Sequence, residues 1–294
     1  MIPYEVEYVR ASSVQDALSL LSGDADAKIL AGGHSLVPMM KLRLARPSFL
    51  VDIGRLPELR GVEVHPDYIS IGSATTHAEL AADSQLTALA PLFALVAHVI
   101  ADPAVRNRGT IGGSLVNADP SADWPAAVLA LEAVMEVVGA KGTRRVPARE
   151  FFVGFMASAV QSDEILTRIH IPLPAAVRVG YRKFRHPSSG YAVAAAAVAL
   201  RFTGDKCVGG TIGITGVADT PFRAYAAETL LGEGLGGGQD GIERIATAAF
   251  DGVAPLEDSF ADAGYRLQLG RVMLKRALAD ACAGNREGMT CSET

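Results

Sequence analysis

The chain has 294 residues, of which 49% are hydrophobic and 20% charged, and its 27 basic and 32 acidic side chains give a formal net charge of −5. This apolar content and modest charge are typical of a folded globular protein and exclude a disordered chain. The length indicates two domains or one large one. Basic residues form only short clusters, such as Lys141, Arg144 and Arg145, so we expect no nucleic-acid partner.

Membrane insertion and secretion are disfavoured by the hydropathy pattern. The longest apolar stretches, residues 89–101 and 191–200, are shorter than the about 20 residues that a spanning helix needs. The first ten residues, MIPYEVEYVR, carry neither a basic start nor an apolar core, so they do not resemble a secretory signal. We therefore expect no membrane span and a cytoplasmic location.

The three cysteines, Cys207, Cys282 and Cys291, stand far apart in the sequence. This spacing offers neither a C-x-x-C pair nor a disulfide framework. Because iron–sulfur clusters usually need four thiolates, we expect no cluster and no metal site on this chain.

The first 55 residues alternate helix and strand. A capping box at residues 13–16 predicts a helix that ends at Gly23, and residues 28–31 predict a short buried strand. That strand runs into the turn Gly32-Gly33-His34-Ser35, after which a helix is expected over residues 36–44. A second strand is expected at residues 49–53.

The next 120 residues contain both kinds of element around one irregular segment. The expected strands are 68–72, 134–139 and 164–171, and the expected helices are about 77–84, 88–101 and 124–133. The segment from Asp102 to Pro120 is predicted to have little regular structure, because Gly, Asn, Asp and Pro are concentrated there.

The run Ile171-Pro172-Leu173-Pro174 breaks regular structure and marks the expected domain boundary. Beyond it the pattern predicts strands and then helices, which indicates an α+β domain with a flexible loop at Gly232–Gly238. The expected strands are 179–185, 191–202 and 207–218, and the expected helices are about 222–231, 239–251 and 259–283. The predicted division is 1–175 (subdomains about 1–55 and 56–175), 176–284, and a flexible tail at 285–294.

Two glycine segments are candidates for holding phosphate. Consecutive backbone N–H groups in a glycine turn can point at one anion, and Ala31-Gly32-Gly33-His34-Ser35 follows a strand as such a site requires. The segment Thr110-Ile111-Gly112-Gly113-Ser114 offers similar backbone, so the two together could hold the two phosphates of a dinucleotide. Neither is a P-loop or a Rossmann fingerprint. The alternative that the first segment is an ordinary strand-to-helix turn without a ligand stays open.

Asp123 follows the second glycine segment by nine residues. Its carboxylate could accept hydrogen bonds from the hydroxyls of a ribose or ribityl chain. A carboxylate favoured by a helix dipole is the alternative interpretation.

Four motifs occur together in this chain: Leu30-Ala31-Gly32-Gly33-His34-Ser35-Leu36, Lys41-Leu42-Arg43, Val105-Arg106-Asn107-Arg108-Gly109-Thr110-Ile111-Gly112-Gly113-Ser114, and Ala118-Asp119-Pro120-x-x-Asp123. At these separations they resemble the FAD-binding medium subunits of molybdenum hydroxylases. That family includes carbon monoxide dehydrogenase medium chains and the flavin domain of xanthine dehydrogenase. The resemblance extends from Tyr4 to about residue 284.

The resemblance implies an α+β fold: an FAD-binding domain of the vanillyl-alcohol-oxidase type, made of two α/β subdomains, followed by a smaller α+β C-terminal domain. FAD would be bound non-covalently, although His34 raises the alternative of a covalent link, because relatives in the wider fold use a histidine. The pyrophosphate would lie between the two glycine segments. The residues implied to contact FAD there are Ile29, Leu30, Ala31, Gly32, Gly33, His34, Ser35 and Leu36 in the first segment, and Thr110, Ile111, Gly112, Gly113 and Ser114 in the second.

The resemblance also assigns contacts outside the glycine segments. Asp123 would bind the ribityl or ribose hydroxyls, Ile100 would lie beside the adenine, and Leu166 would pack near the cofactor. Lys183 would reach FAD from the C-terminal domain, and Tyr191 would cover the isoalloxazine ring. A strand-start aromatic in a core is the alternative interpretation of Tyr191.

The function implied by the resemblance is electron transfer within a complex. A large subunit would carry molybdopterin, and a small subunit would carry two [2Fe-2S] clusters that pass electrons to FAD and then to an external acceptor. The complex would be a dimer of heterotrimers, and this chain needs no catalytic acid–base pair. The alternatives are a self-sufficient flavin oxidase or dehydrogenase of a small organic substrate and an accessory protein without FAD. Because His77, His98 and His186 are isolated in the sequence, they are interpreted as structural.

Overall fold

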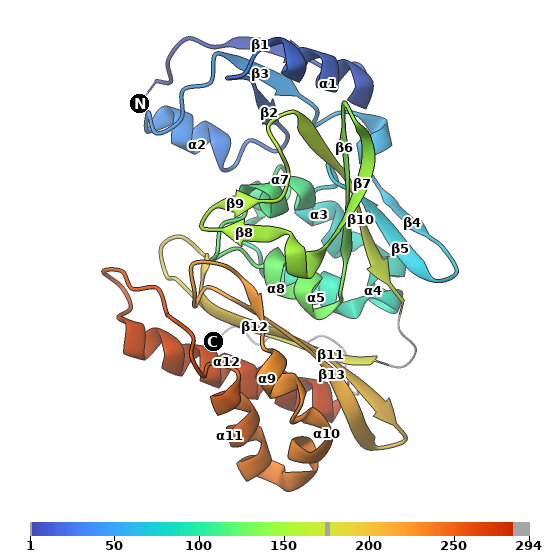
Figure 1. Ribbon diagram of the computed structural model, residues 1–294, viewed down its shortest axis with the longest axis vertical. Helices are drawn as coiled ribbons and strands as arrows, with labels where there is room; N and C mark the ends of the chain where they lie inside the picture. The colour runs from blue at the N-terminus through green and yellow to red at the C-terminus, as the bar shows by residue number, and fades with distance from the viewer. Residues whose placement is uncertain (1, 174–176, 285–294) are drawn as a thin grey trace.

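The computed structural model describes residues 2–173 and 177–284. Three sheets follow one another along the longest axis of the molecule, in the order in which the chain builds them (Figure 1). The predicted boundary at residue 175 and the predicted tail at 285–294 lie outside the described residues. Within the described ranges, no helix combines the length and apolar character needed to cross a membrane.

The first sheet is parallel and has three strands in the order β1-β3-β2. Its elements are β1 (Glu7–Arg10), α1 (Val14–Gly23), β2 (Lys28–Leu30), α2 (Leu36–Lys41) and β3 (Phe49–Asp52). The prediction that the strand near residue 28 is buried was wrong, because β2 lies at the edge of this sheet and its side chains are exposed or half-buried. Ser13 caps α1 by accepting from Asp16 N, but the Asp16 carboxylate accepts from Ser12, so the predicted capping box is only half formed.

The middle sheet is antiparallel, with five strands in the order β4-β5-β10-β6-β7. Its strands are β4 (Val62–Val64), β5 (Tyr68–Gly72), β6 (Val134–Gly139), β7 (Gly142–Pro147) and β10 (Glu164–Pro172). The helical elements of this part are η1 (Pro57–Leu59), α3 (His77–Ala82), α4 (Ser84–Leu89), α5 (Pro91–Val99), α6 (Pro103–Arg106), α7 (Ile111–Asn117), α8 (Trp124–Ala130) and η2 (Ala148–Glu150). A small hairpin of β8 (Phe152–Gly154) and β9 (Ala157–Ser158) completes it, and neither this hairpin nor β4 and β7 was predicted.

The segment predicted to be irregular contains the two short helices α6 and α7. Asp102 caps α6 by accepting from Val105 N, and Thr110 caps α7 by accepting from Gly113 N. The glycines belong to the first turn of α7 because the neighbouring chain is close: a Cβ on Gly112 would lie 2.5 Å from Ser73 Cβ. Close packing, rather than an irregular backbone, explains the glycine content.

The C-terminal sheet is antiparallel, with four strands in the order β11-β12-β13-β14. Its elements are β11 (Val177–Arg185), β12 (Ala192–Thr203), β13 (Lys206–Thr215), β14 (Phe222–Arg223), α9 (Tyr225–Glu228), α10 (Leu231–Gly234), η3 (Leu235–Gly237), α11 (Gly238–Ala248) and α12 (Ala263–Ala283). The flexible loop predicted at 232–238 was wrong, because this segment is helical. One glycine of this segment marks a close approach of two helices, because a Cβ on Gly241 of α11 would lie 1.7 Å from the carbonyl oxygen of Gly234 in α10.

Both faces of the C-terminal sheet are buried, and this explains its small residues. Alternate alanines of β12 join different cores, with Ala195 and Ala197 facing the middle domain and Ala194 and Ala196 facing α12. Glycines allow helices to approach on both sides: a Cβ on Gly213 would lie 2.1 Å from the Ala126 carbonyl oxygen of α8, and one on Gly180 the same distance from the Ala277 carbonyl oxygen of α12. This packing places α8 against β13 on one face of the sheet and α12 against β11 on the other.

Candidate functional site

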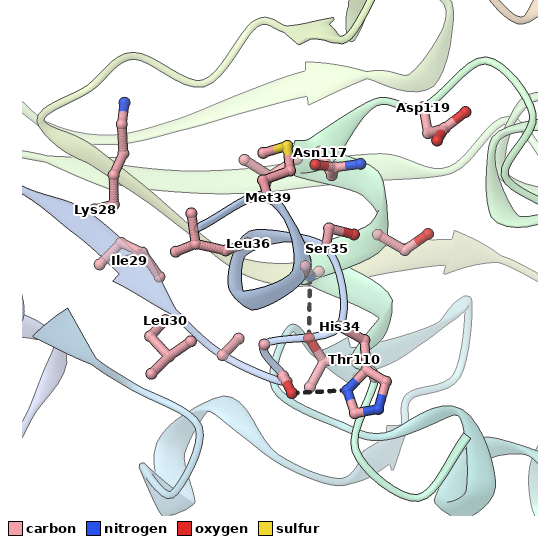
Figure 2. Close-up of a pocket in the computed structure, with 18 of the residues that line it drawn as sticks. Lys28, Ile29, Leu30, His34, Ser35, Leu36, Met39, Thr110, Asn117 and Asp119 are labelled. Carbon is pink, nitrogen blue, oxygen red and sulfur yellow. Dashed lines mark hydrogen bonds between the residues drawn. The ribbon is translucent and has the colours of Figure 1, made fainter. Parts of the chain in front are cut away.

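A pocket of about 1050 Å³ lies where the three parts of the fold meet. It is lined by β2, the turn before α2 and the start of α7 (Figure 2). The Ser189–Tyr191 turn that precedes β12 lines it from the C-terminal domain. Every residue predicted to contact FAD lines this pocket except Ile111 and Lys183. The structure therefore brings together two glycine segments that are about 80 residues apart in the sequence.

The turn from Gly32 to Ser35 presents unpaired backbone donors. Within the described residues, no hydrogen-bond partner is present for the N–H groups of these four residues, whereas Val37 N donates back to the Gly33 carbonyl. Gly33 has φ +75°, which favours glycine. His34 folds over its own turn, with Nδ1 3.0 Å from the Gly32 carbonyl oxygen (Figure 2). Consecutive free N–H groups in such a turn form an anion-binding cradle.

The two glycine segments are in direct contact. A Cβ on Gly32 would lie 2.2 Å from the Arg108 carbonyl oxygen and 2.8 Å from Gly109 Cα. The backbone can approach this closely only because Gly32 lacks a side chain, so the two segments form adjoining parts of one pocket wall.

The second segment does not offer the free backbone donors that its sequence suggested. The N–H groups of Ile111 and Gly112 donate to carbonyls of Thr75 and Ser73, and those of Gly113 and Ser114 donate to the hydroxyl and the carbonyl of Thr110. The Ile111 side chain is fully buried in the core. This segment instead contributes small side chains and the hydroxyls of Thr110 and Ser114 to the pocket wall.

Asp123 is buried and paired with the C-terminal domain. It accepts hydrogen bonds from Tyr181 Oη at 2.5 Å and Lys183 Nζ at 2.9 Å. Burial raises the pKa of the Asp123 carboxyl, and the Lys183 ammonium opposes this shift. Asp123 stands at the N-cap of α8 without a side-chain capping bond, a position where the helix dipole also favours a carboxylate, so the alternative interpretation stays open beside the predicted one. Lys183 lies behind Asp123 rather than in the pocket wall, so its direct contact with a cofactor stays a prediction.

Lys183 also holds the turn that carries Tyr191. Its Nζ donates to the Gly190 carbonyl at 3.0 Å, and Gly190 N donates to the His186 carbonyl. Tyr191 is 41% exposed and lines the pocket. The alternative interpretation, an aromatic side chain buried in a core, was therefore wrong. Burial and the nearby Asp119 charge raise the pKa of Tyr191, while the Ser35 hydroxyl opposes the shift.

Several pocket residues were not predicted. Asp119 belongs to a motif quoted for the resemblance, but it was not assigned to the site; burial raises the pKa of its carboxyl. Lys28, Met39 and Asn117 also line the pocket (Figure 2). His77 lines it as well, although it was interpreted as structural. Nothing in the sequence around an isolated histidine distinguishes a pocket residue from a core residue.

The described residues contain no group of three or more His, Cys, Asp or Glu side chains able to hold a metal ion. Cys207 and Cys282 are free thiols, and Cys291 lies outside the described residues.

Comparison with protein families identifies both parts of the chain. Residues 4–174 match the FAD binding domain in molybdopterin dehydrogenase, and residues 180–281 match the CO dehydrogenase flavoprotein C-terminal domain. The chain belongs to the family of FAD-binding medium subunits of molybdenum hydroxylases. The resemblance inferred from the four motifs is thereby confirmed, as is the fold class.

Curated relatives and solved structures agree with this assignment. The chain is 40% identical to the carbon monoxide dehydrogenase medium chain of Afipia carboxidovorans over 96% of this chain and 99% of the relative. It is 31% identical to the xanthine dehydrogenase FAD-binding subunit of Escherichia coli O157:H7, over 94% of this chain and 96% of the relative. A chain of the reconstituted CO dehydrogenase from Oligotropha carboxidovorans matches with a TM-score of 0.93 at 39% identity, covering 97% of this chain and all of that one. This membership makes the chain an oxidoreductase component of a multi-subunit enzyme, not a self-sufficient oxidase.

Proposed function

We propose that this chain binds FAD non-covalently in the pocket and transfers electrons from a partner's iron–sulfur clusters to an external acceptor. The observation that carries the proposal is the cradle of four unpaired backbone N–H groups at Gly32–Ser35, in a pocket built by family-matching segments. A dinucleotide needs such donors for its phosphates. The residues present therefore fit the cofactor.

The contacts proposed for each part of FAD follow from the pocket wall. The Gly32–Ser35 turn would hold the pyrophosphate, Asp123 the ribose or ribityl hydroxyls, and Ile100 the adenine. Tyr191 would close the pocket over the ring from the C-terminal domain. Bound flavin supplies the ability to take up and release electrons, and the chain supplies binding, orientation and exclusion of water.

The remaining redox chemistry would lie on partner chains. We propose a large subunit with molybdopterin and a small subunit with two [2Fe-2S] clusters, assembled as a dimer of heterotrimers. Support comes from the relatives, which are medium chains or subunits of complexes, such as the 6-hydroxypseudooxynicotine dehydrogenase complex subunit of Paenarthrobacter nicotinovorans. The proposed division into domains at residue 175 and subdomains at about residue 55 stays a prediction, as does the cytoplasmic location.

Exposed apolar side chains beside the pocket support a docked partner. Leu44 is 76% exposed and Met156 37% exposed, and both border the pocket; Phe155, next to Met156 in the β8–β9 hairpin, is 61% exposed. Because a subunit that delivers electrons must approach the flavin pocket, we propose that the iron–sulfur subunit covers this rim, defined as Leu44, Val153, Phe155 and Met156. Large exposed apolar patches typically mark interfaces.

The proposal is tested by purifying the full chain and denaturing it with acid. Non-covalent binding predicts that FAD appears in the supernatant in an amount equal to the chain. Flavin that stays on the precipitated chain would instead indicate a covalent link, with His34 as the first candidate. A chain that never retains or rebinds FAD would contradict the proposal.

A further inference from the structure

His77 is a buried histidine whose chemistry the site described above does not use. Its side chain is at the first position of α3, it is only 4% exposed, and it lines the pocket beside Gly109. Its backbone N–H donates to the Gly109 carbonyl at 3.0 Å, so the histidine is tied to the second glycine segment. The ring therefore has a fixed place at the contact between the two segments.

The tautomer of His77 is set by Trp124. The indole Nε1–H of Trp124, which can only donate, lies 3.1 Å from His77 Nδ1, so Nδ1 must accept and the ring proton must be on Nε2. Burial, with the positive charges of His34 and Arg106, lowers the pKa of His77 to about 4. Near neutral pH the ring is thus a neutral donor with one N–H.

His77 Nε2 has no hydrogen-bond partner among the described residues, yet it is not among their enclosed, unsatisfied polar atoms, so it opens to the pocket. A Cβ on Gly109 would lie 2.8 Å from Nε2, and Gly109 in turn abuts Gly32. The missing side chains thus leave Nε2–H next to the turn that carries the free backbone donors.

We propose that His77 Nε2–H donates a hydrogen bond to a phosphate oxygen of the bound dinucleotide, with Trp124 as the positioning residue that holds the ring in this tautomer. This inference rests on the proposed FAD site and adds a side-chain donor to its backbone cradle. The neutral ring can donate a hydrogen bond to the phosphate without carrying a positive charge itself. Such a bond is stronger than one between two neutral groups, because the phosphate acceptor is charged.

The test compares FAD and riboflavin binding to the full chain after its flavin has been removed. His77→Phe keeps an aromatic ring and removes the donor, so FAD affinity should fall about tenfold or more. Riboflavin, which has the ring and ribityl chain but no phosphate, should bind with unchanged affinity. His98→Phe, at an exposed position of α5, is the matched control and should leave both affinities unchanged.

A second measurement keeps the inference testable if His77→Phe does not fold. In the wild-type chain with 15N-labelled histidine, NMR should show His77 as the Nε2–H tautomer, and FAD but not riboflavin should shift its Nε2 resonance. Equal losses of FAD and riboflavin affinity, an unchanged FAD affinity, or a His77 resonance indifferent to FAD would overturn the inference. If the wild-type chain itself failed to bind FAD, the proposed function would fail instead.

Discussion

Asp123 and Lys183 form an ion pair whose partners come from different parts of the fold. Both side chains are almost fully buried, at 5% and 6% exposed, and Lys183 also donates to the turn carrying Tyr191. A buried carboxylate depends on its partner, because removing one member of such a pair leaves an uncompensated charge. One lysine thus stabilises the pocket wall and the turn that closes it.

Lys183→Met should destabilise the chain by about 3–5 kcal/mol at neutral pH. Burial already raises the pKa of Asp123, and without the ammonium it rises further. A carboxyl with a pKa higher in the folded than in the unfolded chain favours folding at low pH and loses that contribution as the pH rises. The stability lost in Lys183→Met should therefore be smaller in mildly acidic buffer than at neutral pH. Urea unfolding of both chains at the two pH values measures this difference.

Two further variants serve as controls for this effect. Adding Asp123→Asn to Lys183→Met should recover part of the lost stability, because no buried charge remains. Lys275→Met removes an exposed ion pair with Glu243 and should cost less than about 1 kcal/mol. A loss for Lys183→Met that is equal at both pH values would contradict the charge argument.

Gly33→Val should abolish flavin retention while the chain stays folded. A side chain at φ +75° costs about 1–2 kcal/mol per residue, and its Cβ would lie 3.3 Å from Val37 Cγ2, so the N–H cradle must distort. Gly252→Val is matched, since Gly252 has φ +70° and open space around it. Absorbance of bound flavin in both variants checks the prediction, and flavin lost equally from both would show that strain alone, not the cradle, is responsible.

The sequence predicted this site best at positions whose role depends on local sequence patterns. Gly32, Gly33 and Asp123 could be predicted because a glycine turn and a nearby carboxylate have recognisable patterns. His77 could not be, because its pocket position depends on Trp124, 47 residues away, and on space left by Gly109. The N–H groups of Ile111 and Gly112 were misjudged because their partners, Thr75 and Ser73, come from a distant segment.

At the scale of elements, most strands of the two antiparallel sheets and the long helices could be predicted, whereas β4, β7, β14 and the glycine-rich helices could not. Glycine lowers helix propensity, so α7 and α10 were interpreted as irregular segments. In α7 a close neighbour requires glycine, since a Cβ on Gly112 would lie 2.5 Å from Ser73 Cβ. Such requirements belong to tertiary packing and leave no local signal.

Gly213→Ala should destabilise the chain by about 1–3 kcal/mol, the range for an overpacked core. The new methyl group would lie 2.1 Å from the Ala126 carbonyl oxygen and push β13 away from α8, which carries Asp123 at its start. Gly264→Ala, in the first turn of α12 with only an ordinary contact at 3.4 Å, should be neutral or stabilising. Thermal unfolding of the two variants distinguishes them, and similar midpoints would contradict the tight contact between α8 and the C-terminal sheet.

At the scale of the whole molecule, residues from all three parts of the fold line the pocket, so binding couples parts of the chain that are far apart in the sequence. The exposed rim beside it, with Phe155 at the hairpin tip, is where we expect the iron–sulfur subunit.

Phe155→Ser should weaken retention of the iron–sulfur subunit without loss of FAD, because Phe155 is 61% exposed and is not part of the pocket wall. Val208→Ser, at a 52% exposed position on the C-terminal sheet, is the control and should leave the complex intact. Subunit ratios after affinity purification check this prediction. Unchanged ratios for Phe155→Ser would show that the partner docks elsewhere.

The central claim, that this chain is the flavin component of a larger molybdenum enzyme, is tested most directly by purifying the tagged full chain from its own host. The measurement is the ratio of FAD, iron and molybdenum to the chain. The account predicts equal amounts of FAD and chain, with molybdenum and two [2Fe-2S] clusters on two co-purifying subunits. A chain that arrives alone, binds FAD and oxidises an organic compound without partners would contradict it.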